Sequence, residues 1–239
     1  MGLTLVKAVL AKPELTLVCV SERPGFDSHA VNAQLAAHGC KNLMLTSDPK
    51  EMVAAADAVI DFTAPEATLA GTEAVAAKDG VHIIGTTGLS DAQQKKLASY
   101  ADRARIVQSG NFSLGVVLME TLVEKAAALL GDDYDIEIHE MHHKHKKDAP
   151  SGTALMLGRA AAKGRGITLT PVTDRNGERK RGDIGFSVAR GGDVVGAHEV
   201  KFAGPGEVLS LSHEGFSREI YANGALAAAR WAAKQKPGF

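Results

Sequence analysis

The sequence predicts an α/β protein in two parts, a doubly wound parallel sheet followed by an α+β region with an open mixed or antiparallel sheet. Over the first half, short apolar strands alternate with helices that begin at capping residues, which is typical of a parallel sheet covered by helices. From Leu114 the pattern changes to one long amphipathic helix and then to strands divided by glycine-rich turns. The chain has 239 residues and is 45% hydrophobic, which suffices for one large domain or two modest ones.

The charge composition excludes several classes of function. The chain carries 27 Lys and Arg against 28 Asp and Glu, so general attraction to nucleic acid or to an anionic membrane is not expected. No apolar run approaches the roughly 20 residues of a membrane-spanning helix, and no leader precedes the first element. Cys19 and Cys40 form no paired motif, as is usual for reduced thiols. We therefore expect a soluble, cytoplasmic protein.

The elements of the first half follow from local patterns. Three capping motifs open helices at Asp48, Thr63 and Ser90, the first two with a proline close behind. Helix patterns cover residues 3–10, 30–37, 52–56, 65–77 and 90–101. Strand patterns cover residues 15–20, 43–45, 58–62, 81–84 and 105–107.

Several of these strands end in turns that suit a nucleotide. Ligands in open α/β sheets bind beyond the carboxyl ends of the strands, and three such turns occur in succession at 62–63, 85–88 and 109–112. Gly85 and Gly88 permit a close approach of the backbone to a ligand. Glu22 lies twenty residues after Gly2, the spacing at which dinucleotide folds place a carboxylate on the ribose, although a solvated charge is the alternative reading.

The second half predicts two long helices beside a sheet. Leu114 to Leu130 is an amphipathic helix that Gly131 ends, and residues 151–163 form the second helix. Residues 164–182 have no apolar period and are expected to be a loop. Strand patterns cover residues 135–140, 184–188, 194–202 and 208–213, the last three as an antiparallel tail, before a final helix over 225–234.

One stretch, residues 140–154, carries the chemistry. Three histidines and three lysines fall between His142 and Lys147, and Pro150-Ser151 then opens a helix. Histidine supplies a proton donor with a pKa near neutrality, and lysine supplies fixed positive charge. The N–H groups at Ser151-Gly152-Thr153 suit a carboxylate. Beside a nucleotide-type sheet, this stretch predicts hydride transfer to an anionic acceptor, with protonation by a neighbouring acid.

Two other readings of this stretch remain open. His142, His143 and His145 are possible metal ligands, but neighbours in a strand point to opposite faces and the lysines repel a cation, so no metal is expected. A solvated basic loop is the second alternative.

The stretch from Glu140 to Ala154 resembles the signature of the dihydrodipicolinate reductase (4-hydroxy-tetrahydrodipicolinate reductase) family. Each fixed position of that family's E-x-H-H-x-x-K-x-D-x-P-S-G-T-A run is matched. The resemblance continues along most of the chain, at Glu22-Arg23, Asp61-Phe62-Thr63, Gly85 to Gly88, Gly110 to Ser113, Gly182 to Gly185, Arg190 and Asn223 to Ala225.

The resemblance implies an NAD(P)H-dependent reduction of the cyclic imine substrate to tetrahydrodipicolinate in lysine and diaminopimelate biosynthesis. His142 is then the proton donor or an organising acid, and Lys146 is a second donor and carboxylate partner. The dicarboxylate substrate is bound by His143, Gly152 and Thr153, with Ser151 in support. The cofactor-binding residues implied are Met1, Glu22, Arg23, Phe62, Gly85, Thr86, Thr87, Ser109, Gly110, Asn111 and Phe112.

The resemblance also implies the domain organisation. A Rossmann-type domain comprises residues 1–113 and 223–239, and residues 114–222 form the substrate-binding and oligomerisation domain of a homotetramer. Glu22 and Arg23 are compatible with both NADH and NADPH.

The chain departs from the family pattern at both ends. Of the first strand and its glycine-rich turn only Met1-Gly2 is present, and relatives continue past Phe239. We expect the sequence to be an incomplete record of a longer active protein, or one with a mis-assigned start. In the 239-residue chain itself, the strands beside the missing one should lack ladder partners and NAD(P)H should bind weakly. Two alternatives to the active reductase are a truncated, weakly active or inactive remnant and a different NAD(P)-linked reductase of the same fold.

Overall fold

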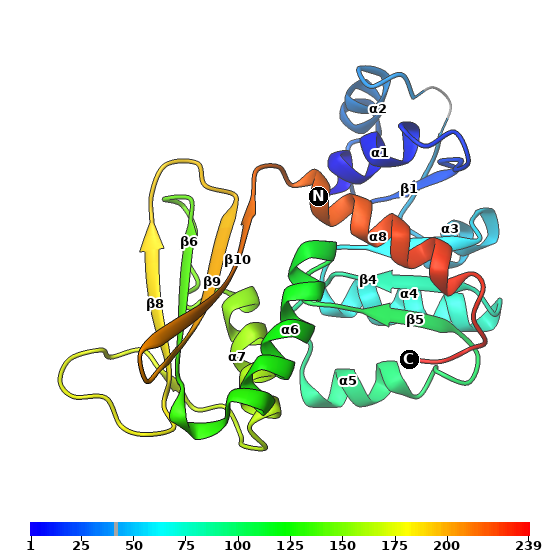
Figure 1. Ribbon diagram of the computed structural model, residues 1–239. Helices are drawn as coiled ribbons and strands as arrows, with labels where there is room; N and C mark the ends of the chain where they lie inside the picture. The colour runs from blue at the N-terminus through cyan, green and yellow to red at the C-terminus, as the bar shows by residue number, and fades with distance from the viewer. Residues whose placement is uncertain (41–42) are drawn as a thin grey trace. The chain divides into compact units, whose positions relative to one another are not determined.

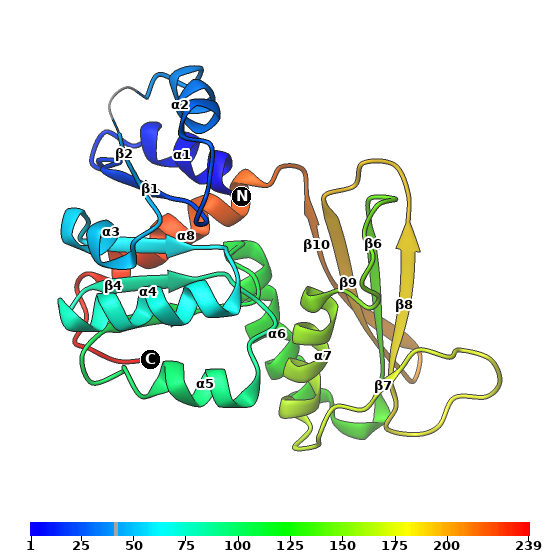
Figure 2. The same ribbon diagram turned by 180° about the vertical axis from the view of Figure 1, so that it is seen from behind.

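A computed structural model describes residues 1–40 and 43–239. The chain divides into two compact units, one formed by Met1–Phe112 with Tyr221–Phe239 and the other by Ser113–Ile220 (Figures 1 and 2). Each unit is described by itself below. In the part of the chain that the structure describes, none of the helices combines the length and apolar character that crossing a membrane requires.

The first unit contains parallel strands that alternate with helices, which confirms the predicted α/β class. Its sheet consists of two separate pieces, β1–β2 and β3–β4–β5. Within the described residues β1 pairs only with β2, and β3 only with β4, so each lacks a ladder partner on one side, as expected. The elements are α1 (Gly2–Leu10), β1 (Cys19–Ser21), α2 (Ser28–Ala36), β2 (Met44–Thr46), α3 (Pro49–Ala55), β3 (Ala58–Asp61), α4 (Pro65–Ala77), β4 (Val81–Ile84), α5 (Asp91–Ala98), β5 (Arg105–Gln108) and α8 (Glu219–Ala232).

Helices cover both faces of the three-stranded piece. Ile83 of β4 packs with Ala225 and Ala229 of α8, whereas Ile84 packs with Val75 of α4 and Leu97 of α5 (Figure 2). Ile83 and Ile84 are both fully buried, as continuous apolar strands of a parallel sheet should be. Packing on both faces therefore holds β4 in place, and the turn 85–88 begins at the carboxyl end of this strand.

The capping motifs gave one wrong prediction. Ser90 forms the predicted capping box with Gln93, and the Asp48 side chain accepts the Lys50 N–H. Thr63 does not cap α4, because its N–H and its hydroxyl both donate to the Asp61 carboxylate. The N-cap residue of α4 is Ala64, which has no side chain able to accept a hydrogen bond.

The second unit is a five-stranded sheet in the order β10-β9-β6-β8-β7, with α6 and α7 packed on one face (Figure 1). The prediction of an antiparallel tail holds for β9 and β10 but is wrong for β8, which pairs in parallel with β6. The predicted loop 164–182 also contains a two-residue strand, β7. The elements are α6 (Leu114–Leu130), a 3-10 turn (Gly131–Asp133), β6 (Asp135–His142), α7 (Gly152–Gly164), β7 (Pro171–Val172), β8 (Ile184–Arg190), β9 (Gly196–Gly204) and β10 (Glu207–Gly215).

Alternation along β6 decides which side chains face the helices. Ile136 and Ile138 are fully buried against the helix side, and the same period places Glu140 and His142 on that side. His139 and Met141 lie on the opposite face, which no helix of this unit covers. The alternation along β6 therefore orients Glu140 and His142 toward the helices.

Candidate active site

Glu140 is the centre of a buried polar cluster at the carboxyl end of β6. Its side chain is almost inaccessible to solvent. It accepts hydrogen bonds from both terminal nitrogens of Arg190 at 2.8 and 3.0 Å, from the Ser151 N–H at 2.9 Å and from His142 Nδ1 at 2.6 Å. Burial alone would raise the Glu140 pKa, but the bonds from Arg190, His142 and Ser151 outweigh it and lower the pKa. The carboxylate is therefore ionised and joins β6, β8 and the start of α7.

His142 takes its tautomer from Glu140. A carboxylate only accepts hydrogen bonds, so Nδ1 of His142 carries a proton and Nε2 is the atom left for chemistry. Burial lowers the His142 pKa, and the charges of Lys146 and Arg190 lower it further. The short bond to Glu140 opposes these effects without overcoming them. In the ligand-free protein, His142 is a neutral imidazole at neutral pH.

Gly196 keeps the Nε2 side of His142 open. A Cβ atom on Gly196 would lie 3.0 Å from His142 Nε2 and 3.3 Å from Cδ2. Gly196 begins β9, the neighbour of β6. A glycine at this position therefore leaves room beside the one ring nitrogen that Glu140 does not engage.

His198 is a second buried histidine, and sequence reasoning missed it. Its Nε2 lies 3.1 Å from Ser151 Oγ, and its ring meets that of His142 edge-on at 5.1 Å. Burial, with the nearby His142 as a smaller cause, lowers the His198 pKa to about 4. The signal was available, because His198 shares the helix-facing period of Val200 and Phe202 along β9. Arg190 belonged to the resemblance, but its role was not predicted.

The basic stretch after β6 is more exposed. Lys146 Nζ pairs with Asp148 Oδ1 at 2.8 Å, and the rings of His143 and His145 lie 6.4 Å apart. The turn is held by the Lys146 N–H, which donates to the His143 carbonyl. Among the described residues, no group of three or more His, Cys, Asp and Glu side chains is arranged to hold a metal ion.

The start of α7 lies beside Glu140 and His142. Ser151 is the N-cap residue, and its hydroxyl accepts the Ala154 N–H. Its own N–H is already donated to Glu140. Gly152 is exposed, and a Cβ placed on it would have no neighbour within 4 Å. The first turn of α7 is thus open at Gly152, while Ser151 holds the Glu140 and His198 side chains.

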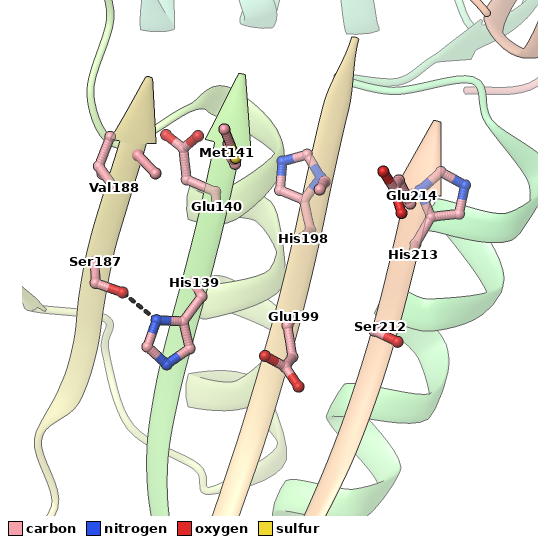
Figure 3. A pocket seen from close by; sticks show the side chains of 12 residues that line it. His139, Glu140, Met141, Ser187, Val188, His198, Glu199, Ser212, His213 and Glu214 are labelled. Atoms are coloured by element: carbon pink, nitrogen blue, oxygen red, sulfur yellow. Dashed lines mark hydrogen bonds between the residues drawn. The ribbon is translucent and has the colours of Figure 1, made fainter. Parts of the chain in front are cut away.

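A hollow of about 380 Å³ lies over β8, β6, β9 and β10. Figure 3 shows His139, Ser187 and Glu199 along it, with His139 Nδ1 hydrogen-bonded to Ser187 Oγ. His139 lies on the face of β6 opposite to His142. The lining of the hollow also includes Glu140 and His198 of the buried cluster, so it extends from the open face of the sheet to that cluster (Figure 3).

In the first unit, the structure brings the predicted turn residues together at the carboxyl ends of β3, β4 and β5. The rings of Phe62 and Phe112 lie 5.8 Å apart. A Cβ atom on Gly85 would lie 2.3 Å from the Phe62 ring, so only glycine fits there. The Thr86 hydroxyl, at 3.2 Å, donates to Asp61 at the end of β3.

The last turn of this edge is equally constrained. The Ser109 hydroxyl donates to the Asn111 carbonyl and accepts the Asn111 N–H. A Cβ atom on Gly224 of α8 would lie 1.6 Å from the Phe112 carbonyl oxygen, so α8 fixes this segment by direct contact. The residues Phe62, Gly85, Thr86, Thr87 and Ser109 to Phe112 fit a nicotinamide nucleotide, because this edge combines close backbone approach with fixed hydroxyl and amide groups.

The remaining predicted cofactor residues lie elsewhere in the first unit. Met1 is the N-cap residue of α1. Glu22 directly follows β1, its N–H donates to the Thr46 carbonyl, and Arg23 is exposed. Glu22 and Arg23 adjoin the β1–β2 piece, which no strand of the described residues joins to β3–β4–β5, whereas Met1 packs with α8.

Family models match almost the whole chain. Residues 1–112 match the model described as "Dihydrodipicolinate reductase, N-terminus", and residues 115–239 match "Dihydrodipicolinate reductase, C-terminus". The chain is 51% identical to the 4-hydroxy-tetrahydrodipicolinate reductase of Dinoroseobacter shibae, with 100% of this chain and 91% of that protein covered. It is 49% identical to the protein of the same name from Ruegeria pomeroyi, with the same coverage.

Solved structures show the same fold. The dipicolinate-bound dihydrodipicolinate reductase of Paenisporosarcina sp. TG-14 matches with a TM-score of 0.79 at 23% identity, over 99% of this chain and 91% of that one. A myo-inositol dehydrogenase from Corynebacterium glutamicum matches with a TM-score of 0.60 at 13% identity, over 99% and 86% of the two chains.

Proposed function

This chain belongs to the dihydrodipicolinate reductase family, and on that premise we propose that His142, oriented by Glu140, supplies the proton in its reaction. The activity is the NAD(P)H-dependent reduction of 4-hydroxy-tetrahydrodipicolinate to tetrahydrodipicolinate in lysine biosynthesis. The observation that carries the proposed role is the buried 2.6 Å bond between Glu140 and His142 at the end of β6.

The cofactor is a nicotinamide nucleotide, which supplies a hydride when it is bound. The residues that would hold it are those at the carboxyl ends of β3, β4 and β5, from Phe62 to Phe112. Glu22 would accept hydrogen bonds from the ribose hydroxyls, and Arg23 would meet a 2′-phosphate. This pair supports the use of both NADH and NADPH.

The substrate carboxylates are proposed to bind at the start of α7. The N–H groups of Gly152 and Thr153 lie in the first turn of the helix, where the helix dipole favours an anion. His143 and Lys146 add donors from the preceding turn. Ser151 acts in support, because its N–H and hydroxyl already hold Glu140 and His198. The reductase from Paenisporosarcina, whose structure contains dipicolinate, supports a dicarboxylate as the ligand.

The proton comes from His142 Nε2. Glu140 stabilises the imidazolium form, whereas burial and the neighbouring Lys146 and Arg190 disfavour it. A bound dicarboxylate adds negative charge beside the ring and so raises the His142 pKa. The proton is thus loaded when the substrate is present and passes to it together with the hydride.

The proposal also covers oligomeric state and location. The sheet face of the second unit that carries His139 has no helix of its own unit over it, and Met141 and Val208 are exposed there. We propose that this face joins copies of the chain into a homotetramer, which sedimentation analysis tests directly. Cys19 and Cys40 are free thiols, which are usual in the reducing cytoplasm, and this supports a cytoplasmic location.

The function is tested by the loss of NADPH absorbance after addition of freshly prepared 4-hydroxy-tetrahydrodipicolinate. The active reductase predicts turnover that needs this substrate and either NADPH or NADH. The remnant alternative, which the names of the reported relatives do not support, predicts a folded protein without turnover. NADPH-dependent reduction of another imine, but not of this substrate, would indicate a different reductase of the same fold.

A further inference from the structure

A second buried polar cluster lies in the first unit, between α4 and the strands β3 and β4. His82 of β4 has no exposed surface, and Asp61 at the end of β3 is 6% exposed. The reaction proposed above uses neither side chain. Burying a carboxylate beside an imidazole costs free energy unless both groups are well partnered, so the arrangement needs a cause. The threonines around the pair are Thr63, Thr68, Thr72 and Thr86.

One oxygen of Asp61 holds two turns of the cofactor edge. Asp61 Oδ1 accepts the Thr63 N–H at 2.9 Å, the Thr63 hydroxyl at 2.6 Å and the Thr86 hydroxyl at 3.2 Å. Thr63 follows β3 and Thr86 follows β4, so the carboxylate bridges the ends of adjacent strands. A further bond, from the Thr63 N–H to Thr86 Oγ1 at 3.0 Å, closes the group. The position of Thr86 therefore depends on Asp61.

The other oxygen faces His82. Nε2 of His82 lies 3.4 Å from Asp61 Oδ2, and Nδ1 lies 2.9 Å from Thr72 Oγ1. The Thr72 hydroxyl also lies 2.7 Å from the Thr68 carbonyl. If the hydroxyl proton points to Nδ1, then Nε2 carries the ring proton. If it points to the Thr68 carbonyl, Nδ1–H donates to Thr72, and a bare Nε2 would face a carboxylate. The first arrangement, which directs an N–H group of His82 at the Asp61 carboxylate, is therefore the favourable tautomer.

The contact with His82 keeps Asp61 ionised, so that its oxygens can accept hydrogen bonds from Thr63 and Thr86. Burial alone would raise the Asp61 pKa, but His82 and the threonine hydroxyls outweigh it and lower the pKa below its ordinary value. A protonated Asp61 would lose acceptor capacity for Thr63 and Thr86.

We propose that Asp61 and His82 are positioning residues for the cofactor: His82 holds the Asp61 carboxylate, and Asp61 holds Thr63 and Thr86 in the geometry that receives the nicotinamide end. This inference rests on the proposed function, because that function assigns Thr86 to the cofactor site. The positioning role predicts that loss of Asp61 or His82 weakens contacts to the nicotinamide half of the cofactor and leaves contacts to the adenosine half unchanged.

The test compares two ligands on the same variants. Binding of NADPH and of 2′-phospho-ADP-ribose, which lacks the nicotinamide, is measured for wild type and Asp61→Asn by titration calorimetry. We expect the Kd for NADPH to rise about tenfold, as for the loss of hydrogen bonds to a charged group, with the Kd for 2′-phospho-ADP-ribose unchanged. Glu73→Gln, which removes an exposed carboxylate from the same helix α4, is the matched control and should leave both constants unchanged.

A second pair of variants separates positioning from packing and also serves if Asp61→Asn does not fold. His82→Gln retains an N–H donor toward Asp61, whereas His82→Leu fills similar space without one. We expect His82→Leu to weaken NADPH binding several-fold more than His82→Gln, by the value of one hydrogen bond to a charged group. Equal binding by the two folded variants, or equal weakening of both ligands in Asp61→Asn, would overturn the proposal.

The wild-type titration distinguishes failure of the proposed function from failure of the positioning role. A wild-type protein that binds neither NADPH nor NADH contradicts the proposed function itself. A wild-type protein that binds NADPH while Asp61→Asn and His82→Leu bind it equally well contradicts only the positioning role.

Discussion

Glu140 Oε2 lies 2.6 Å from His142 Nδ1, and the same carboxylate also accepts hydrogen bonds from both terminal nitrogens of Arg190. Both partners lower the pKa of Glu140. Arg190 keeps the carboxylate ionised, and the carboxylate supports a positive His142. The positive charge of Arg190, however, lowers the His142 pKa. A single carboxylate therefore sets the tautomer and orientation of the proposed proton donor and favours its positively charged form.

Replacing Glu140 tests this relationship. Glu140→Gln keeps the size of the side chain but removes its charge, so the His142 pKa falls further and its tautomer is no longer fixed. We expect kcat to fall about 100-fold, the lower end of what a positioned general acid contributes, with the Kd for NADPH unchanged. Glu199→Gln, on the opposite face of the sheet, is the control. A kcat within twofold of wild type in folded Glu140→Gln would refute the role.

The pH dependence of the reaction has a defined direction. His142 must be protonated to donate, and its pKa in the ligand-free protein is lowered below 6.5. The kcat/KM for the substrate, which reports the free enzyme, should therefore fall as pH rises through a midpoint below 6.5. The midpoint in kcat should be higher, because the bound dicarboxylate favours the imidazolium. A kcat/KM profile with no descending limb in that range would contradict the assignment.

Sequence reasoning found the half of this cluster that is contiguous in the chain. Glu140, His142 and Ser151 belong to one motif, and the alternation along β6 orients Glu140 and His142. Arg190 and His198 enter from β8 and β9, and their contacts depend on strand order. Strand order was not predicted from the sequence, and β8 was wrongly placed in an antiparallel tail, whereas it pairs in parallel with β6. The connection from α7 to β8 has no apolar period, so nothing in its sequence indicates that β8 runs parallel to β6.

Thr63 illustrates a second limit of the sequence. A threonine two residues before a proline is a normal cap, and α4 does begin at Pro65. The Asp61 carboxylate competes successfully for the same hydroxyl and N–H. A local pattern cannot report such competition, because it depends on His82 and Thr86 from the next strand and its turn. The parallel strands of the first unit, in contrast, were predicted correctly from strand and turn patterns alone.

Gly196 provides a steric test of the open side of His142. In Gly196→Ala the new Cβ would lie 3.0 Å from Nε2, so the ring must shift or lose access to the substrate. We expect kcat/KM to fall about tenfold or more, although alanine is intrinsically favoured over glycine in a strand by about 0.5–1 kcal/mol. Ala197→Ser, on the opposite face of β9, is the matched control. Unchanged kinetics in Gly196→Ala would show that Nε2 is not the reacting atom.

His198 should make stability depend on pH. Its pKa is about 4 in the folded protein and near 6.5 when unfolded, so the unfolded chain binds more protons between these values. Its contribution is intact above the unfolded pKa and is lost as pH falls toward 4, amounting to about 3 kcal/mol. Urea denaturation from pH 7 to 5 should show less loss of stability in His198→Gln than in wild type. Parallel curves for the two proteins would indicate that His198 is not buried as a neutral ring.

The most direct test of the central claim compares His142→Gln and Lys146→Ala with wild type in the NADPH-dependent reduction of 4-hydroxy-tetrahydrodipicolinate. The account predicts that kcat falls about 100-fold or more in each variant, the range expected for loss of a general acid or of a group that orients the substrate, while the Kd for NADPH stays within about twofold. Lys147→Ala, an exposed neighbour in the same stretch, should retain activity. Wild-type kcat in His142→Gln would contradict the claim that this histidine supplies the proton.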